Sequence, residues 1–341
     1  MEIEKNLEEL GIEPIKPLDF METSQIVTKW INSLLITFPF EEMDGCQLAE
    51  KMYKCKMYWA KFDKKLGNAN YVYKNQSLYI RDEILAVEED TFIWHECIHY
   101  MQDNRDDKGN LFQMGLCEFS KFKAYGVGMN EAATQYIAAK MLHYPHEKVN
   151  YCGIPCKTIS KNYYPIMSNL IEQLENAVGE KLLVNSTLFG NEKCVTHLME
   201  VMGETITRQI QEEFDRILEN KAGVAEGNVQ AQEIVKQSYI KIQNTLLEKY
   251  FEGATQLAKT APELEEYIKR LEKHREIIGN VDNYIFYENF RIKQMKKMQK
   301  KLIGLKKKKN LPVLFKKNKL IAILMSVRNL FVRKQQEYDE K

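Results

Sequence analysis

One short run of residues constrains this 341-residue chain more than any other, and it is His95-Glu96-Cys97-Ile98-His99. It lies within residues 90–105, where apolar residues at helical spacing follow Asp90, a residue type that often caps a helix. Residues four apart share one face of a helix, so both imidazoles can reach one metal ion. Glu96 lies beside the pair, where it can take a proton from a water that the metal polarises. The run therefore predicts a metal site on a helix.

A second run, Met129 to Gln135, contains a candidate for a third metal ligand. A catalytic zinc ion usually has three protein ligands and one open position, so two histidines leave the site one ligand short. Glu131 follows His99 by 32 residues, in the first turn of a helix that we expect to begin at Asn130. Glycines just before that helix permit a sharp approach of the chain.

This arrangement resembles the gluzincin group of zinc metallopeptidases, in which the two histidines of HExxH and a glutamate from a following helix bind zinc. The resemblance implies that His95, His99 and Glu131 bind Zn²⁺ and that Glu96 is the general base in the hydrolysis of a peptide bond. It covers about 65 residues, from the strand region near Leu78 to Leu142. It does not distinguish between branches of the group.

Three residues around Glu131 refine the resemblance. Asn130 and Thr134 match the flanking positions of the NExxS/T-D pattern of thermolysin-like members. Gln135 stands where that pattern has an aspartate that orients a histidine ligand. The amide oxygen of Gln135 can still accept a hydrogen bond, with less charge to hold the imidazole. We therefore interpret the chain as a divergent gluzincin.

The resemblance also implies a further hydrogen-bond donor that stabilises the oxyanion of the reaction. Tyr125 and His197 are the candidates from outside the two runs. Each has a structural alternative, because an aromatic residue near a helix start commonly belongs to the core and a histidine in an apolar helix is commonly satisfied there.

The metal-site residues have structural alternatives too. The two histidines would be polar residues on an amphipathic helix, and the helix macrodipole by itself favours a glutamate in a first turn. Asp103 continues the face of His95 and His99 by one more turn, where it would orient a ligand or face solvent.

The remaining pattern predicts an α+β fold, and the resemblance implies that it contains a zincin-like core with a small sheet and an active-site helix. Helical spacing predicts helices over residues 24–36 and 46–61, and Tyr, Val and Ile predict a strand pair over residues 70–82. Beyond residue 163 the chain is mainly helical, with amphipathic runs at residues 165–178, 193–220, 229–259 and 263–278. We divide it into a zincin-like metallopeptidase domain (1–160), a helical domain (161–280) and a basic amphipathic helical tail (281–341).

The tail dominates the charge distribution. The chain has 49 Lys and Arg against 48 Asp and Glu, but residues 291–334 carry 16 Lys and Arg and no acidic residue. Lysines there alternate with apolar residues at helical spacing, which suits an amphipathic helix on an anionic surface. That surface is a membrane leaflet, nucleic acid or the acidic remainder of this chain. Two aromatic residues in this segment give little support to base stacking.

Cysteine usage and apolar runs bear on the compartment. Seven cysteines is an odd number, and the N-terminus begins with charged residues and no apolar signal-peptide run. The longest apolar run, residues 320–327, is far below the roughly 20 residues of a membrane-spanning helix. We expect a cytoplasmic zinc endopeptidase without a transmembrane segment that acts on a protein or peptide substrate. The alternative is a non-enzymatic, metal-containing binding protein that acts through its helical half and basic tail.

Overall fold

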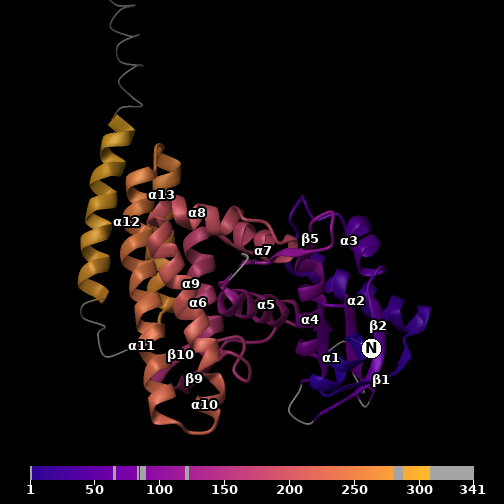
Figure 1. Cartoon of the computed structure of the whole chain (residues 1–341). Coiled ribbons are helices and arrows are strands. Elements are labelled where there is room, and N and C mark those ends of the chain that lie inside the picture. The colour runs from indigo at the N-terminus through magenta and orange to yellow at the C-terminus, as the bar shows by residue number, and fades with distance from the viewer. Residues whose placement is uncertain are drawn as a thin grey trace, which may run out of the picture.

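The chain has a mixed α+β fold, as the sequence predicts (Figure 1). The computed structural model describes residues 2–63, 67–82, 84, 90–119, 123–279 and 287–307. All strands of these residues lie before residue 160, and from residue 165 onward their regular elements are helices. The strand-containing part and the helical part lie side by side.

The first sheet has four strands in the order β1-β2-β4-β3. The strands are β1 (Ile12–Pro17), β2 (Lys56–Phe62), β3 (Ala69–Val72) and β4 (Ser77–Arg81). β2 and β4 are parallel, the other pairs are antiparallel, and β3 forms one edge. The strand pair expected over residues 70–82 is thus confirmed as the β3–β4 hairpin.

The helix expected over residues 46–61 is wrong in its second half. The helix α3 (Gly45–Met52) ends at Met52, and residues 56–62 form β2 instead. Met57, Ala60 and Phe62 of this strand are buried, and it pairs with β1 on one side and β4 on the other. Pairing on both sides outweighs a helical spacing of apolar residues, which a half-buried strand can also show over so short a run.

Two helices of the strand-containing part carry the three predicted ligands. They are α4 (Thr91–Gln102) and α5 (Val127–Met141), and the other helices of this part are α1 (Glu2–Glu9), α2 (Phe20–Thr37) and α3. Asp90 caps α4, as expected, because its side chain accepts a hydrogen bond from the amide of Phe92. α5 begins at Val127, three residues before the expected start.

A second sheet connects α4 to α5. Its strands follow one another in the order β5-β6-β7-β8. They are β5 (Asp103–Arg105), β6 (Leu111–Met114), β7 (Cys117–Phe119) and β8 (Ala124–Tyr125). After α5, the hairpin of β9 (Glu147–Tyr151) and β10 (Ile154–Thr158) leads to the helical part.

Helices form the rest of the described chain. They are α6 (Pro165–Val178), α7 (Glu180–Phe189), α8 (Lys193–Met202), α9 (Glu204–Glu219), α10 (Lys221–Ala225), α11 (Val229–Thr245), the π-helix η2 (Leu246–Tyr250), α12 (Phe251–Leu257), α13 (Ala261–Ile277) and a helix over residues 287–307. The expected single run 193–220 is two helices, because Gly203 adopts a φ of 89° between them.

α5 lies between two hydrophobic cores and contributes residues to both. Met129, Ala132 and Tyr136 face a core made with the helical part, whereas Ile137 and Met141 belong to a core made with α2, α4 and the first sheet. A helix buried on both faces needs no polar side, which explains why its apolar residues follow no single stripe. The domain boundary expected near residue 160 therefore does not coincide with a division between the cores.

The described part of the expected basic tail packs on the helical part. In the helix over residues 287–307, Met298 is fully buried. Lys297 and Lys306 form ion pairs of 3.1 and 2.7 Å with Glu252 of α12 and Glu265 of α13. Residues 308–341, including the apolar run 320–327, lie outside the described residues. No described helix is long and apolar enough to cross a membrane.

The start of α5 is held by α9 at very close range. The carboxylate of Asp215 accepts hydrogen bonds from the amides of Gly126 and Gly128, at 3.1 and 2.6 Å. These amides begin the helix and have no partner within it, so Asp215 serves as a cap supplied by another helix. A Cβ atom on Gly128 would lie 2.3 Å from the carbonyl oxygen of Phe214. Only glycine lets the two backbones approach this closely.

We predict that Gly128→Ala destabilises the protein by about 1–3 kcal/mol, since α5 and α9 must move apart to admit the methyl group. Gly304→Ala is the matched control, because a Cβ there meets nothing within 4 Å. Alanine has the higher helix propensity, so the control should be neutral or stabilising by up to about 1 kcal/mol. Urea denaturation measures both variants. Equal stability of the two would contradict the close contact.

Candidate metal centre

Three side chains from α4 and α5 converge on one point. The Nε2 atoms of His95 and His99 lie 2.9 Å apart. They lie 3.4 and 3.2 Å from the two carboxylate oxygens of Glu131. The histidine side chains are buried, and that of Glu131 is 25% exposed. The structure therefore brings together the three residues that the sequence nominates as metal ligands.

The spacing of these atoms fits a metal ion. Ligand atoms at 2.0–2.1 Å from a tetrahedral zinc ion lie about 3.3 Å from one another. The observed separations of 2.9 to 3.4 Å are close to this value. One carboxylate and two neutral imidazoles suit Zn²⁺ among the divalent metals, and three ligands leave a fourth position open.

Two buried glutamines determine which imidazole nitrogens face the metal position. The Oε1 atom of Gln135 lies 3.1 Å from Nδ1 of His95, and the Oε1 atom of Gln102 lies 3.0 Å from Nδ1 of His99. An amide oxygen only accepts hydrogen bonds, so each Nδ1 carries the proton and each Nε2 presents its lone pair to the shared point. The hydrogen bond expected for Gln135 is confirmed.

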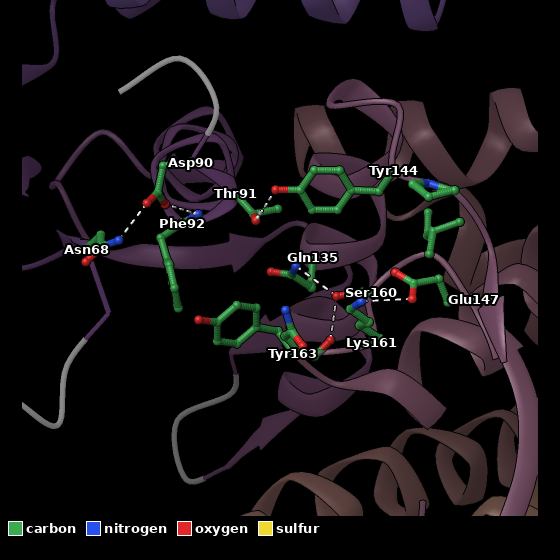
Figure 2. A pocket seen from close by; sticks show the side chains of 13 residues that line it. Asn68, Asp90, Thr91, Phe92, Gln135, Tyr144, Glu147, Ser160, Lys161 and Tyr163 are labelled. Carbon is green, nitrogen blue, oxygen red and sulfur yellow. Dashed lines mark hydrogen bonds and ion pairs between the residues drawn. The ribbon is translucent and has the colours of Figure 1, made fainter. Parts of the chain in front are cut away.

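The amide groups of both glutamines are held in turn. Nε2 of Gln135 donates to Ser160, in the segment before α6 (Figure 2). Nε2 of Gln102 donates to Thr134, and Asn130 donates to Oε1 of Gln102. Asn130 and Thr134, which match flanking positions of the thermolysin-like pattern, thus position the partner of His99.

The electrostatics of the point where these side chains converge favour a positive charge. Burial lowers the pKa of His99, but the carboxylate of Glu131 outweighs this effect and raises the pKa to about 9. Burial raises the pKa of Glu131, but the two histidines outweigh it and hold the pKa well below its usual range. Both shifts express the demand of this position for positive charge, which a metal ion meets in place of the proton.

Glu96 lies on α4, next to His95, but is not one of the three converging residues. Its Oε2 accepts a hydrogen bond of 2.8 Å from the backbone amide of Tyr71, in the edge strand β3. Burial raises the pKa of the Glu96 carboxyl, although the neighbouring histidines and this hydrogen bond oppose the shift. The carboxylate is thereby oriented beside the metal position and keeps one oxygen clear of the Tyr71 amide.

The triad and Glu96 line one cavity of about 610 Å³. Residues from both parts of the chain form its walls, including Tyr71 of β3, Tyr164 and Lys221. A second cavity of about 340 Å³ shares Phe92, Gln135 and Tyr163 with it (Figure 2). The three converging side chains therefore border an open space and not a closed core.

The structure does not bring Tyr125 or His197 to this cavity. Nε2 of His197 lies 3.0 Å from the hydroxyl of Tyr250, within the helical part. The ring of Tyr125 contacts the cationic groups of Lys123 and Arg208 at 4.7 and 4.8 Å. Neither residue lines the cavity around the triad, so the geometry corrects both as oxyanion candidates.

Asp103 does not orient a ligand either. α4 ends at Gln102, and the backbone of Asp103 is extended. Its carboxylate accepts hydrogen bonds from the hydroxyl of Tyr71 and from the guanidinium of Arg105, at 2.6 and 2.7 Å. Gln102, three residues after His99, takes the orienting position instead.

Sequence reasoning missed three residues of this site. Gln102 lies at i+3 from His99, a spacing that places side chains on one face of a helix and that could have identified it. Tyr164 and Lys221 line the cavity from positions far along the chain. No local motif marks these two residues, and they become visible through the tertiary structure alone.

Comparison of the chain with protein-family models, with curated proteins and with solved structures gives no match. The motif spacing and the geometry of the site therefore carry the functional argument.

We predict that purified wild-type protein contains close to one zinc ion per chain, and that His95→Ala and Glu131→Ala lose most of it. Each substitution removes one of the three converging ligand atoms. His146→Ala is the control, because His146 is exposed and pairs with Glu172. Elemental analysis by mass spectrometry measures the metal. A Glu131→Ala variant that retains zinc as tightly as the wild type would refute the three-ligand site.

We further predict that Gln102→Leu and Gln135→Leu each weaken zinc binding by roughly 10- to 100-fold, because the imidazoles lose the acceptors that fix their protonation and orientation. Gln47→Leu, at an exposed position of α3, serves as the control. Competition against a zinc-binding dye measures the dissociation constants. Unchanged affinity in both buried variants would show that the glutamines do not orient the ligands.

Proposed function

We propose that this chain is a zinc-dependent metallopeptidase with a zincin-like core, which hydrolyses internal peptide bonds. One observation carries the proposal: the three converging ligand atoms and the carboxylate of Glu96 line the same cavity. Structural zinc sites are closed by four protein ligands, whereas catalytic sites keep an open position. A cavity at that position supports catalysis over a purely structural role.

The residues divide the chemistry among them. A zinc ion held by His95, His99 and Glu131 supplies a Lewis acid that polarises a carbonyl group and acidifies water. Glu96 accepts the proton from the attacking water and returns it to the leaving amine. The hydrogen bond from the backbone amide of Tyr71 holds the carboxylate of Glu96 in place during both proton transfers.

The cavity supports an extended peptide as the substrate. β3 is an edge strand, and Asn70 and Tyr71 of this strand line the cavity. An edge strand beside a site can accept a substrate segment by strand addition. The aromatic side chains of Phe92, Tyr163 and Tyr164 provide apolar walls for substrate side chains.

Tyr164 is the oxyanion donor that we propose. It lines the cavity together with the triad and Glu96. Burial and the carboxylates of Glu131 and Glu96 raise the pKa of its phenol, so it stays protonated at neutral pH and able to donate. We therefore propose it in the role first considered for Tyr125 and His197.

We also propose that the protein acts in a reducing compartment such as the cytoplasm. All seven cysteines are free, and five of them are buried. Burial raises the pKa of buried thiols such as Cys55 and Cys194 to about 12, so they stay protonated and unreactive.

We predict that Glu96→Gln retains zinc and lowers the hydrolysis rate by about 10²- to 10⁴-fold, because glutamine has the shape of glutamate but cannot accept the proton. A library of internally quenched synthetic peptides measures the rate, and elemental analysis measures the metal. Glu50→Gln, at an exposed position of α3, is the control. Full activity of zinc-loaded Glu96→Gln would eliminate Glu96 as the base, and a wild type without hydrolysis would contradict the proposed activity.

A further inference from the structure

Lys221 brings a positive charge to the cavity that contains the metal centre. It is the first residue of the short helix α10, in the helical part. It lines the cavity although it lies far along the chain from the ligand helices α4 and α5. Its Nζ lies 3.9 Å from the ring centroid of Tyr164, which also lines the cavity. The ammonium group is thus held over an aromatic face rather than against a carboxylate.

Lys221 differs in this respect from other lysines of the described chain. Lys140 and Lys161 form ion pairs with Glu175 and Glu147. In the described ranges, no carboxylate forms an ion pair with Lys221. Burial lowers the pKa of its ammonium, and Glu131 opposes this shift only in part. Lys221 is an exposed residue, and its ammonium group lies against the ring of Tyr164 at the edge of the cavity. An anion bound in the cavity would supply the counterion that this group lacks among the described residues.

The carboxylates within the cavity do not provide that counterion. Both oxygens of Glu131 face the histidines, and Glu96 accepts from the amide of Tyr71. The acidic groups on the side of the ligand helices are thus already engaged in contacts. Lys221 has no acidic partner among the residues that line the cavity. Such an arrangement selects a substrate that brings its own negative charge.

Tyr164 holds its position under the lysine in an uncommon backbone conformation. Its φ and ψ are 53° and 46°, in the left-handed region that non-glycine residues rarely adopt. Pro165 follows at once as the first residue of α6. Local strain of this kind persists where surrounding structure enforces it and is concentrated at ligand sites. Here the residue that precedes α6 also carries the ring that contacts the ammonium group.

We propose that Lys221, supported by the ring of Tyr164, binds a carboxylate of the substrate and makes the site selective for peptides with negative charge near the cleaved bond. This inference rests on the proposed peptidase function. The carboxylate belongs to an Asp or Glu side chain or to the free C-terminus of the peptide. Both sources present the same planar anion to a lysine, and they are separated by the choice of peptide.

The test measures binding apart from cleavage. Zinc-loaded, full-length Glu96→Gln protein is titrated with fluorescent peptides that differ in one group: Glu against Gln in end-blocked peptides, and a free against an amidated C-terminus in neutral peptides. We expect one of the two carboxylates to strengthen binding by roughly tenfold, as for a charged contact with partial solvent screening. Lys221→Met in the same background should abolish that preference, and Lys221→Glu should reverse it in favour of Lys-containing peptides.

Lys269→Met is the matched control, because Lys269 is an exposed helical lysine outside the cavity. It should leave the preference unchanged, and thermal unfolding checks that all variants are folded. Equal binding of charged and neutral peptides, or a preference that survives Lys221→Met, overturns the inference. Cleavage by the wild type is assayed separately with the same peptides. Failure of cleavage with an intact binding preference would refute the peptidase proposal and leave the role of Lys221 standing.

Discussion

Three electron-pair donors that point at one place repel one another unless a cation lies between them, and this constraint governs the centre of the molecule. The arrangement of Glu131, His95 and His99 can persist because α4 and α5 are locked together by buried amide groups. Gln102 joins both helices through Thr134 and Asn130, so the same contacts that pack the helices also orient an imidazole. Packing and ligand geometry therefore cannot be altered independently.

The second sheet contacts the same hydrogen-bond network between α4 and α5. The amide of Leu116, in the turn between β6 and β7, donates to Oδ1 of Asn130. Gly115 in that turn has a φ of 55°, and a Cβ atom on it would lie 2.0 Å from the same oxygen. The segment between the two ligand helices thus has a close contact with the network that holds them.

The sequence predicts the parts of this site that obey local rules. Helical spacing and the Asp90 cap predict α4, and the motif spacing nominates Glu131, which the fold then brings to the histidines. The failures come where the chain departs from a regular element. Asp103 would share the face of His99 only if α4 continued, but the helix ends one residue earlier. Lys221 and Tyr164 depend on how distant helices dock, and no short pattern encodes that contact.

Because Asp215 of α9 caps α5 and both hydrophobic cores pack on it, the two parts of the chain are not interchangeable modules. A fragment that ends near residue 160 would keep all three candidate ligands but lose the cap of the helix that carries one of them. It would also expose the face of α5 that Met129 and Tyr136 occupy. Order in the helical part therefore supports the helix that carries Glu131.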